Sequence, residues 1–221
     1  MHCLWCDQEI IKELNWNNLF QLPRDEVLCQ DCKEEMHLLK GPCCPKCSRE
    51  TAEREICHDC ARWGGAPLEK NTSLYRYDSF LKEVVAKWKY RGDYILVHVF
   101  KEDFMKRFKA LKISKEAVLV PIPLSEERFA ERGFNQSEAL ARLLPLETAN
   151  PLYRVHSEKQ SKKSRYDRMT TDNPFTITTS ITQPIVLIDD IYTTGRTLQH
   201  AAKLLKEAGA PSVVSFTLIR G

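Results

Sequence analysis

The fold is decided by Pro184-Ile-Val-Leu-Ile-Asp-Asp-Ile-Tyr-Thr-Thr-Gly-Arg-Thr197. Its four apolar residues, 185–188, predict a strand that is buried on both faces. Asp189 and Asp190 come where that strand ends, and a short turn rich in hydroxyl groups and glycine follows at 193–197. Apolar residues at helical spacing come directly after the turn and predict an amphipathic helix. The stretch therefore predicts a strand, a polar turn and a helix, with two carboxylates at the junction.

This junction has the chemistry of a site for a phosphorylated sugar. Ligands of open parallel sheets bind beyond the carboxyl ends of the strands. The first turn of the helix offers unpaired N–H groups to a phosphate, and Gly195 allows close approach of the backbone. Ionised Asp189 and Asp190 only accept hydrogen bonds, so they suit sugar hydroxyls or a hydrated Mg²⁺ rather than a phosphate. A phosphorylated ribose matches both ends of such a site.

The same stretch resembles the phosphoribosyl-diphosphate (PRPP) motif of the type I phosphoribosyltransferases. That motif has an apolar strand, two acidic residues, two variable residues and a Thr-Thr-Gly-x-Thr loop. The alternative is an ordinary strand–turn–helix with a polar turn, but all the elements of the motif coincide in order. The resemblance implies contacts with the PRPP ribose and 5′-phosphate from Asp189, Asp190, Thr193, Thr194, Gly195, Arg196 and Thr197.

Length and charge indicate one medium domain with a smaller one. The chain has 221 residues and a formal net charge of +3. The charge is uneven, because residues 1–62 carry 8 Lys/Arg against 12 Asp/Glu and residues 63–221 carry 25 against 18. No apolar run is long enough to span a bilayer, and the first residues lack the pattern of a signal peptide. We therefore expect a cytoplasmic protein whose basic part is the C-terminal one.

Eight of the nine cysteines form four C-x-x-C pairs within residues 1–62. Two intervening residues let a tight turn aim both sulfurs at one ion, and Zn²⁺ prefers four such ligands. Sites closed by four cysteines have no open position, so we expect two structural zinc ions; a redox role of the thiols is the alternative. The sequential pairing, which gives two consecutive zinc ribbons with a short helix near Cys32 to Leu39, is favoured over a crossed one. The expected metal ligands are Cys3, Cys6, Cys29, Cys32, Cys44, Cys47, Cys57 and Cys60. Cys43 is the odd cysteine; it could replace Cys44, but Cys44 gives the standard spacing to Cys47.

A linker containing Gly64 and Gly65 leads into the main domain. Residues 73–77 predict a strand, and apolar residues at helical spacing predict helices over about 81–92 and 95–108. The run Lys87-Trp-Lys-Tyr-Arg-Gly92 combines cations with aromatic rings. Solvated helix faces would explain the charges singly, but the mixture also suits a phosphate or a stacked base.

The rest of the main domain repeats the order of strand, loop and helix. Residues 117–123 predict a second buried strand, and the loop after it is expected to bring Arg128 and Arg132 near a helix N-terminus, where an anion is favoured. Further strands are expected at 152–155, 175–178 and 212–219. Repeated strand–helix units indicate an α/β fold with a mostly parallel sheet.

A long basic loop separates the strands expected at 152–155 and 175–178. Phosphoribosyltransferases use a flexible loop at this point of the fold to cover the diphosphate. With the other motifs, this loop makes the whole chain similar to the ComF family. The resemblance rests on the four C-x-x-C pairs, Val120-Pro-Ile-Pro123, Glu131-Arg-Gly-Phe-Asn-Gln136, Lys159-Gln160 with Arg165 and Arg168, Asn173-Pro-Phe175, and the motif at 189–197.

The family resemblance implies a double zinc ribbon at 1–62 on a type I phosphoribosyltransferase domain at 63–221. It implies action in natural transformation near incoming single-stranded DNA, with a competence helicase and a recombination mediator as possible partners. It also implies displacement at the sugar carbon that bears the diphosphate of Mg²⁺-bound PRPP. The expected catalytic residues are Asp189, Asp190, Lys159 and Arg165. The further candidates for pyrophosphate or DNA contacts are Lys87, Arg91, Arg128, Arg132, Gln160 and Arg168.

Two hypotheses about function remain open. The first is an enzyme that transfers phosphoribosyl from PRPP to an unidentified acceptor, and the Asp-Asp pair and basic loop favour it. The second is a protein that senses PRPP without turnover and binds single-stranded DNA. The missing acceptor site and the basic stretches flanked by aromatic residues favour the second hypothesis.

Overall fold

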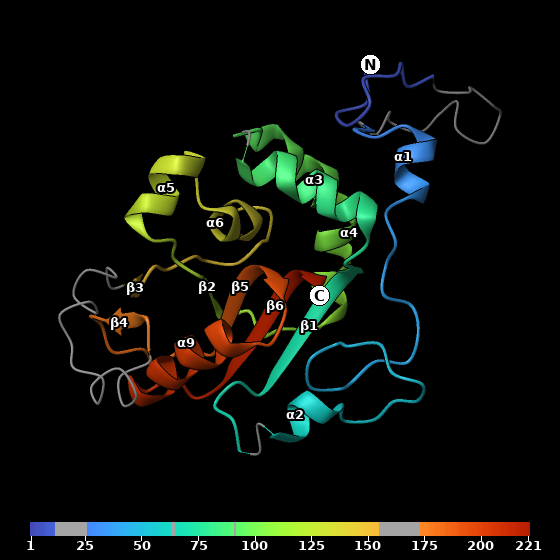
Figure 1. The fold of residues 1–221 in the computed structure, drawn as a ribbon. Coiled ribbons are helices and arrows are strands. Elements are labelled where there is room, and N and C mark those ends of the chain that lie inside the picture. Colours follow the sequence, from blue (N-terminus) through green and yellow to red (C-terminus); the bar gives the residue numbers. More distant parts are fainter. Residues whose placement is uncertain (12–25, 63–64, 91, 155–172) are drawn as a thin grey trace, which may run out of the picture.

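The computed structural model describes residues 1–11, 26–62, 65–90, 92–154 and 173–221. Its centre is a four-stranded parallel sheet in the order β1-β6-β5-β2, which Figure 1 shows from the side. The strands are β1 (Lys70–Arg76), β2 (Val118–Pro121), β5 (Ile185–Tyr192) and β6 (Val213–Arg220). The expected α/β architecture is thereby confirmed.

Helices cover both faces of the sheet because its central strand is apolar on both sides. In β5, Val186 and Ile188 pack with one cluster of buried side chains, whereas Ile185 and Leu187 pack with the other. The first cluster includes side chains of α3 (Ser79–Tyr90), α4 (Val97–Ala110) and α6 (Gln136–Ala141). The second includes those of α9 (Arg196–Glu207). A 3₁₀ turn, η1 (Tyr94–Leu96), precedes α4.

Two expectations about the main domain were wrong. The strands near 152 and 175 do not extend the large sheet; β3 (Leu152–Arg154) and β4 (Phe175–Ile177) pair with each other in a separate antiparallel sheet. The segment expected to be the Arg128–Arg132 loop is a helix, α5 (Glu126–Arg132). That helix begins because the Ser125 hydroxyl accepts a hydrogen bond from the Arg128 amide, and Gly133, at φ 76°, ends it. Ser and Gly at these positions are typical helix boundaries.

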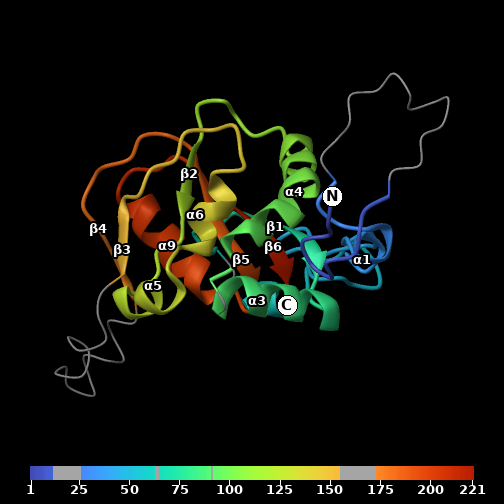
Figure 2. The same ribbon diagram turned by 90° about the horizontal axis from the view of Figure 1, so that it is seen from above.

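The cysteine module lies along the edge of the sheet formed by β1. The Leu39 amide donates to the Leu74 carbonyl, and the Asn71 amide donates to the Lys46 carbonyl. Side chains of the first ribbon join the cluster under α3 and α4, and those of the second join the cluster under α9. Figure 2 shows the first ribbon and α1 on the side of the molecule away from β3 and β4. The module thus covers an edge strand that would otherwise expose unpaired backbone groups.

The short helices of the module differ from the expectation. The helix α1 spans Gln30–Glu34, instead of the expected 32–39, and α2 spans His58–Arg62. The chain leaves the helical path after Glu34 because Leu38 pairs with Tyr75 of β1. Within the described residues, every helix is too short or too polar to cross a membrane. The boundary expected at residue 62 stays a prediction.

Candidate functional site

Two carboxylates lie in the second half of β5, which continues to Tyr192 instead of ending at the aspartates as expected, because Ile191 and Tyr192 still pair with β6; each carboxylate has its own partner. Asp189 Oδ1 accepts a hydrogen bond of 3.0 Å from the Ser137 hydroxyl and one of 2.9 Å from the Asp190 amide. Asp190 forms an ion pair with Lys89, which reaches it from α3. The side chains of Lys89 and Asp190 are only 12% and 14% exposed, so this pair is mostly shielded from water. The site therefore includes a cation of the protein itself, the ammonium group of Lys89.

The surroundings of Asp189 favour its protonated form. Burial and the neighbouring charge of Asp190 raise the pKa of Asp189 to about 7, although the hydrogen bonds and Lys89 act in the opposite direction. Perturbed carboxyl groups of this kind are common at functional sites. Asp189 can therefore exchange a proton close to neutral pH.

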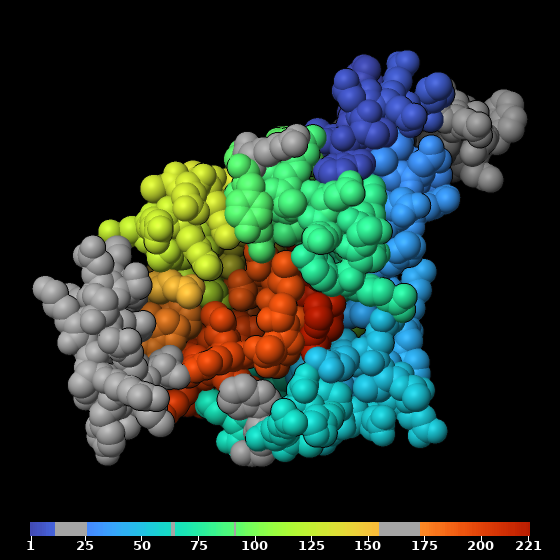
Figure 3. Space-filling view, in the orientation of Figure 1, coloured from blue at the N-terminus to red at the C-terminus, as the bar shows by residue number. Residues whose placement is uncertain are grey.

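The loop after β5 is shaped by a glycine. Gly195 has φ 79° and directly precedes α9, which starts at Arg196. A Cβ atom there would lie 2.1 Å from the Tyr192 hydroxyl oxygen, so another side chain would meet both backbone strain and a steric clash. Thr193, Thr194 and Arg196 are exposed. Figure 3 shows the orange part of the surface, to which β5 and α9 contribute, between the green of α3 and the cyan of the second ribbon. The loop offers hydroxyl groups and the N-terminus of a 12-residue helix to solvent.

The basic residues expected to contact pyrophosphate or DNA are dispersed. Lys87 lies 3.8 Å from an Asp93 carboxylate oxygen and 5.4 Å from the centre of the Trp5 ring. Arg132 donates to the Gln136 amide oxygen at 2.8 Å, and Arg128 is exposed on α5. Arg91, Lys159, Gln160, Arg165 and Arg168 lie outside the described residues, so their expected roles stay predictions.

Three residues near the two carboxylates are not among the site residues expected from the sequence. Lys89 lies in the basic and aromatic run that drew attention to its neighbours, and its place in the last turn of α3 could have identified it. Ser137 follows Asn135, whose side chain caps α6 and accepts from the Ser137 amide. Arg154, at the end of β3, has a lowered pKa because of its burial and the charge of Arg128, while the charge of Asp189 acts to raise it. All three are far from the motif at 189–197 in the sequence, so spacing along the chain does not assign them to the site.

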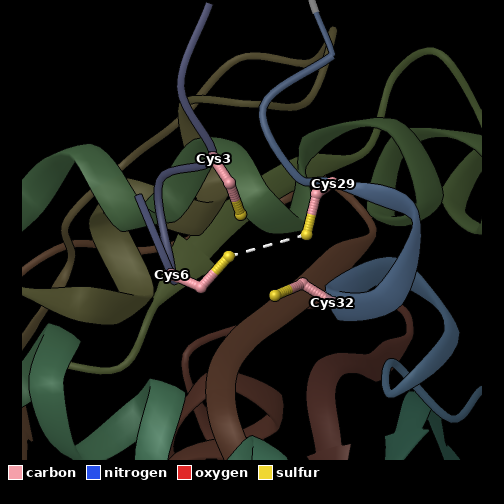
Figure 4. A group of neighbouring side chains, drawn as sticks. All are labelled: Cys3, Cys6, Cys29 and Cys32. Atoms are coloured by element: carbon pink, nitrogen blue, oxygen red, sulfur yellow. Dashed lines mark hydrogen bonds between the residues drawn. The ribbon is translucent and has the colours of Figure 1, made fainter. Parts of the chain in front are cut away.

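The cysteines form two groups in the sequential arrangement. Cys3, Cys6, Cys29 and Cys32 make one group, Cys44, Cys47, Cys57 and Cys60 make the other, and the sulfurs of each group lie within 4.8 Å of one another. Figure 4 shows the four side chains of the first group pointing toward a common centre. Zinc–sulfur bonds of about 2.3 Å in a tetrahedron require sulfurs about 3.8 Å apart. The observed separation of 3.6 Å for Cys6–Cys29 and for Cys47–Cys57 fits that geometry.

The protonation of the cysteines also suits a metal. Although burial raises the pKa of the Cys3 and Cys44 thiols, hydrogen bonds from backbone amides lower it further, to about 6 and about 7. Burial and the neighbouring sulfurs raise the pKa of Cys32 and Cys60 instead. Because metal ligands must be thiolates, a divalent cation that binds either group would displace the remaining thiol protons.

Comparisons with known proteins find two domain families and several relatives of this chain. Residues 1–61 match the double zinc ribbon domain family, and residues 130–221 match the phosphoribosyl transferase domain family. Competence protein ComFC of Bacillus subtilis is 41% identical over 99% of this chain and 94% of its own length. Competence protein ComFC of Streptococcus pneumoniae is 36% identical over 100% of both chains. The crystal structure of a purine phosphoribosyltransferase from Pyrococcus horikoshii is 13% identical, with a TM-score of 0.24, over 68% of this chain and 87% of its own.

Proposed function

This chain belongs to the family of competence protein ComFC, and on that premise we propose that it binds PRPP and acts in natural transformation. The proposed reaction transfers the phosphoribosyl group to an acceptor and releases pyrophosphate. The observation that carries this proposal is the junction of β5 and α9. There, Asp189 and Asp190 lie in the second half of a central parallel strand, and a loop that requires glycine at position 195 leads into the helix.

Each end of this junction suits one part of PRPP. The loop at 193–197 would hold the 5′-phosphate through backbone amides, threonine hydroxyls and the helix dipole. Asp189 and Asp190 would accept hydrogen bonds from the ribose hydroxyls. In the transition state the C1–oxygen bond to the diphosphate lengthens, the sugar gains positive charge, and the carboxylates stabilise that charge.

The ion pair of Lys89 with Asp190 bears on how Mg²⁺ would enter. Because an ammonium group already neutralises one of the two carboxylates, the protein offers less than a full set of metal ligands. Mg²⁺ would arrive as part of the substrate, held by the diphosphate and by several waters. Lys159 and Arg165 would then stabilise the departing pyrophosphate.

An assay of pyrophosphate release from Mg²⁺–PRPP tests the enzymatic proposal. Candidate bases and single-stranded DNA would be offered as acceptors, with the double variant Asp189→Asn, Asp190→Asn beside the wild type. Acceptor-dependent release that the double variant loses supports transfer. PRPP binding without release from any acceptor would contradict it.

A second candidate function, a PRPP sensor that binds single-stranded DNA, is favoured by exposed aromatic rings beside basic residues. Phe129 and Tyr153, which are 50% and 55% exposed, line a hollow of 350 Å³ between α5 and β3, whose charged lining residues are Glu126 and Glu138; the neighbouring basic residues, Arg128 and Arg154, are adjacent to the two rings only in sequence. The Arg132 guanidinium lies 5.4 Å from the centre of the Tyr90 ring, which is 68% exposed. Bases of single strands stack on such rings while cations contact the phosphates.

A competence helicase and a recombination mediator are the proposed partner proteins in natural transformation, whichever of the two functions holds.

A double variant, Phe129→Ala with Tyr153→Ala, tests the stacking surface. It should weaken binding of an oligothymidylate by at least tenfold, since stacking contributes about 1–3 kcal/mol per base. Unchanged binding would remove this surface from the DNA site.

A further inference from the structure

Arg220, the last residue of β6, joins three parts of the molecule. Its side chain is almost fully buried, and the residue is only 6% exposed. Nη1 donates to the carbonyls of Tyr192 and Thr193, at 3.0 Å each, and Nη2 donates to the sulfur of Cys47 at 3.7 Å. The guanidinium also lies 5.0 Å from the centre of the Tyr192 ring. One side chain therefore connects the second cysteine group with the start of the loop after β5.

These contacts determine where the loop begins. The carbonyls of Tyr192 and Thr193 belong to the last residue of β5 and the first residue of the loop. The Tyr192 hydroxyl lies directly beneath Gly195, because a Cβ atom there would be 2.1 Å from it. By binding both carbonyls and packing on the Tyr192 ring, Arg220 positions the start of the loop and the side chain that Gly195 contacts.

Charge explains why Arg220 lies beside the cysteines. A buried guanidinium is unfavourable unless an anionic partner compensates it. A zinc ion bound by four thiolates carries a net charge of about −2, and Cys47 is one of the four sulfurs of the second group. The second metal site can therefore supply the compensating charge, in addition to stabilising its own ribbon.

We propose that Arg220 is a positioning residue that couples the second zinc site to the loop at 193–197. Tight PRPP binding would then require an intact second zinc site. The inference rests on the proposed function for the identity of the ligand. The positioning of the loop can be measured without any ligand, however.

The neighbouring strand provides a matched control. Arg76, the last residue of β1, is paired in register with Arg220. It also reaches the second ribbon, where Nε and Nη2 donate to the two carboxylate oxygens of Glu50 at 2.7 Å each. Replacing Arg76 removes a bridge between a strand end and the same ribbon, but its hydrogen bonds go to Glu50 rather than to the loop.

The experiment compares Arg220→Gln, Arg220→Lys and Arg76→Gln with the wild type. Hydrogen exchange of the 194–197 amides, zinc content and calorimetric PRPP affinity are measured on each full-length protein. We expect Arg220→Gln to exchange these amides faster and to bind PRPP about tenfold more weakly, the effect of losing one or two hydrogen bonds. Arg220→Lys keeps the charge without the planar fork, so it should fall between Arg220→Gln and the wild type. Arg76→Gln should behave like the wild type.

The outcomes separate this inference from the proposed function. Wild-type exchange at 194–197 in Arg220→Gln would overturn the coupling, as would an equal effect of Arg76→Gln. If Arg220→Gln does not fold, Arg220→Lys decides in the same way. If the wild type does not bind PRPP, the proposed function fails, while the exchange data still support or overturn the positioning role.

Discussion

Replacing Asp189 with Asn should stabilise the protein while abolishing PRPP binding. Asn has nearly the same shape, and its Oδ1 can keep the hydrogen bonds from Ser137 and from the Asp190 amide. It removes a carboxylate whose pKa is raised from 3.8 to about 7, first by burial and then by Asp190. Ionised Asp189 therefore lowers the free energy of unfolding of the wild type, and the neutral Asn of the variant does not.

The magnitude and its pH dependence follow from the same shift. Raising the pKa from 3.8 to about 7 corresponds to about 4 kcal/mol at a pH above both values, so we expect a gain of about 2–4 kcal/mol at pH 8. The folded pKa lies above the unfolded one, so the wild type loses stability as pH rises from about 4 to about 7. The advantage of Asp189→Asn should thus grow over this window and level off above about pH 8.

Urea denaturation of both proteins from pH 5 to pH 8.5 measures the effect. The control is Asp190→Asn, which leaves the largely buried Lys89 without its partner and should destabilise the protein. Equal stability of Asp189→Asn and the wild type at pH 8, or a difference that does not change with pH, would refute this explanation of the site.

Three other predictions concern the loop, the metals and DNA. Gly195→Ala should weaken PRPP binding by at least tenfold and lower the free energy of unfolding by about 2 kcal/mol. The reason is that a Cβ atom at this positive φ would clash with the Tyr192 side chain. Wild-type PRPP affinity in calorimetry and wild-type stability in urea denaturation would contradict this. Elemental analysis should find two zinc ions per chain, and a strong chelator should unfold the cysteine module, as seen by circular dichroism; a count near one would be incompatible with two sites. Affinity for single-stranded DNA should fall steeply with salt in a filter-binding titration, since phosphate contacts release counterions, and a flat response would argue against a basic DNA surface.

The sequence predicted those parts of the fold in which local pattern and burial agree. The apolar run before Asp189 predicted β5 because both of its faces are buried, and the C-x-x-C spacing predicted two zinc ribbons. The pairing of β3 with β4 could not be predicted, because short strands carry little information about their partners. The segment with Arg128 has no clear apolar stripe, so the sequence pattern favours a loop there, although the Ser125 cap and the terminal Gly133 are typical of the helix that the structure has.

The candidate site was predicted only where its residues are contiguous. Lys89 and Ser137 lie on other helices and reach the carboxylates through tertiary packing. The contacts of Arg220 with Tyr192 and Cys47 depend on the register of β6 with β5 and on the docking of the second ribbon. Neither can be inferred from spacing along the chain.

The central claim is that the junction of β5 and α9 binds PRPP. Its most direct test is a calorimetric titration of the zinc-loaded protein with PRPP in the presence of Mg²⁺, with ribose 5-phosphate and pyrophosphate as separate titrants. We predict one PRPP per chain, bound more tightly than either fragment, and no binding to the double variant Asp189→Asn, Asp190→Asn. Absence of PRPP binding to the wild type, or equal binding to the double variant, would contradict the claim.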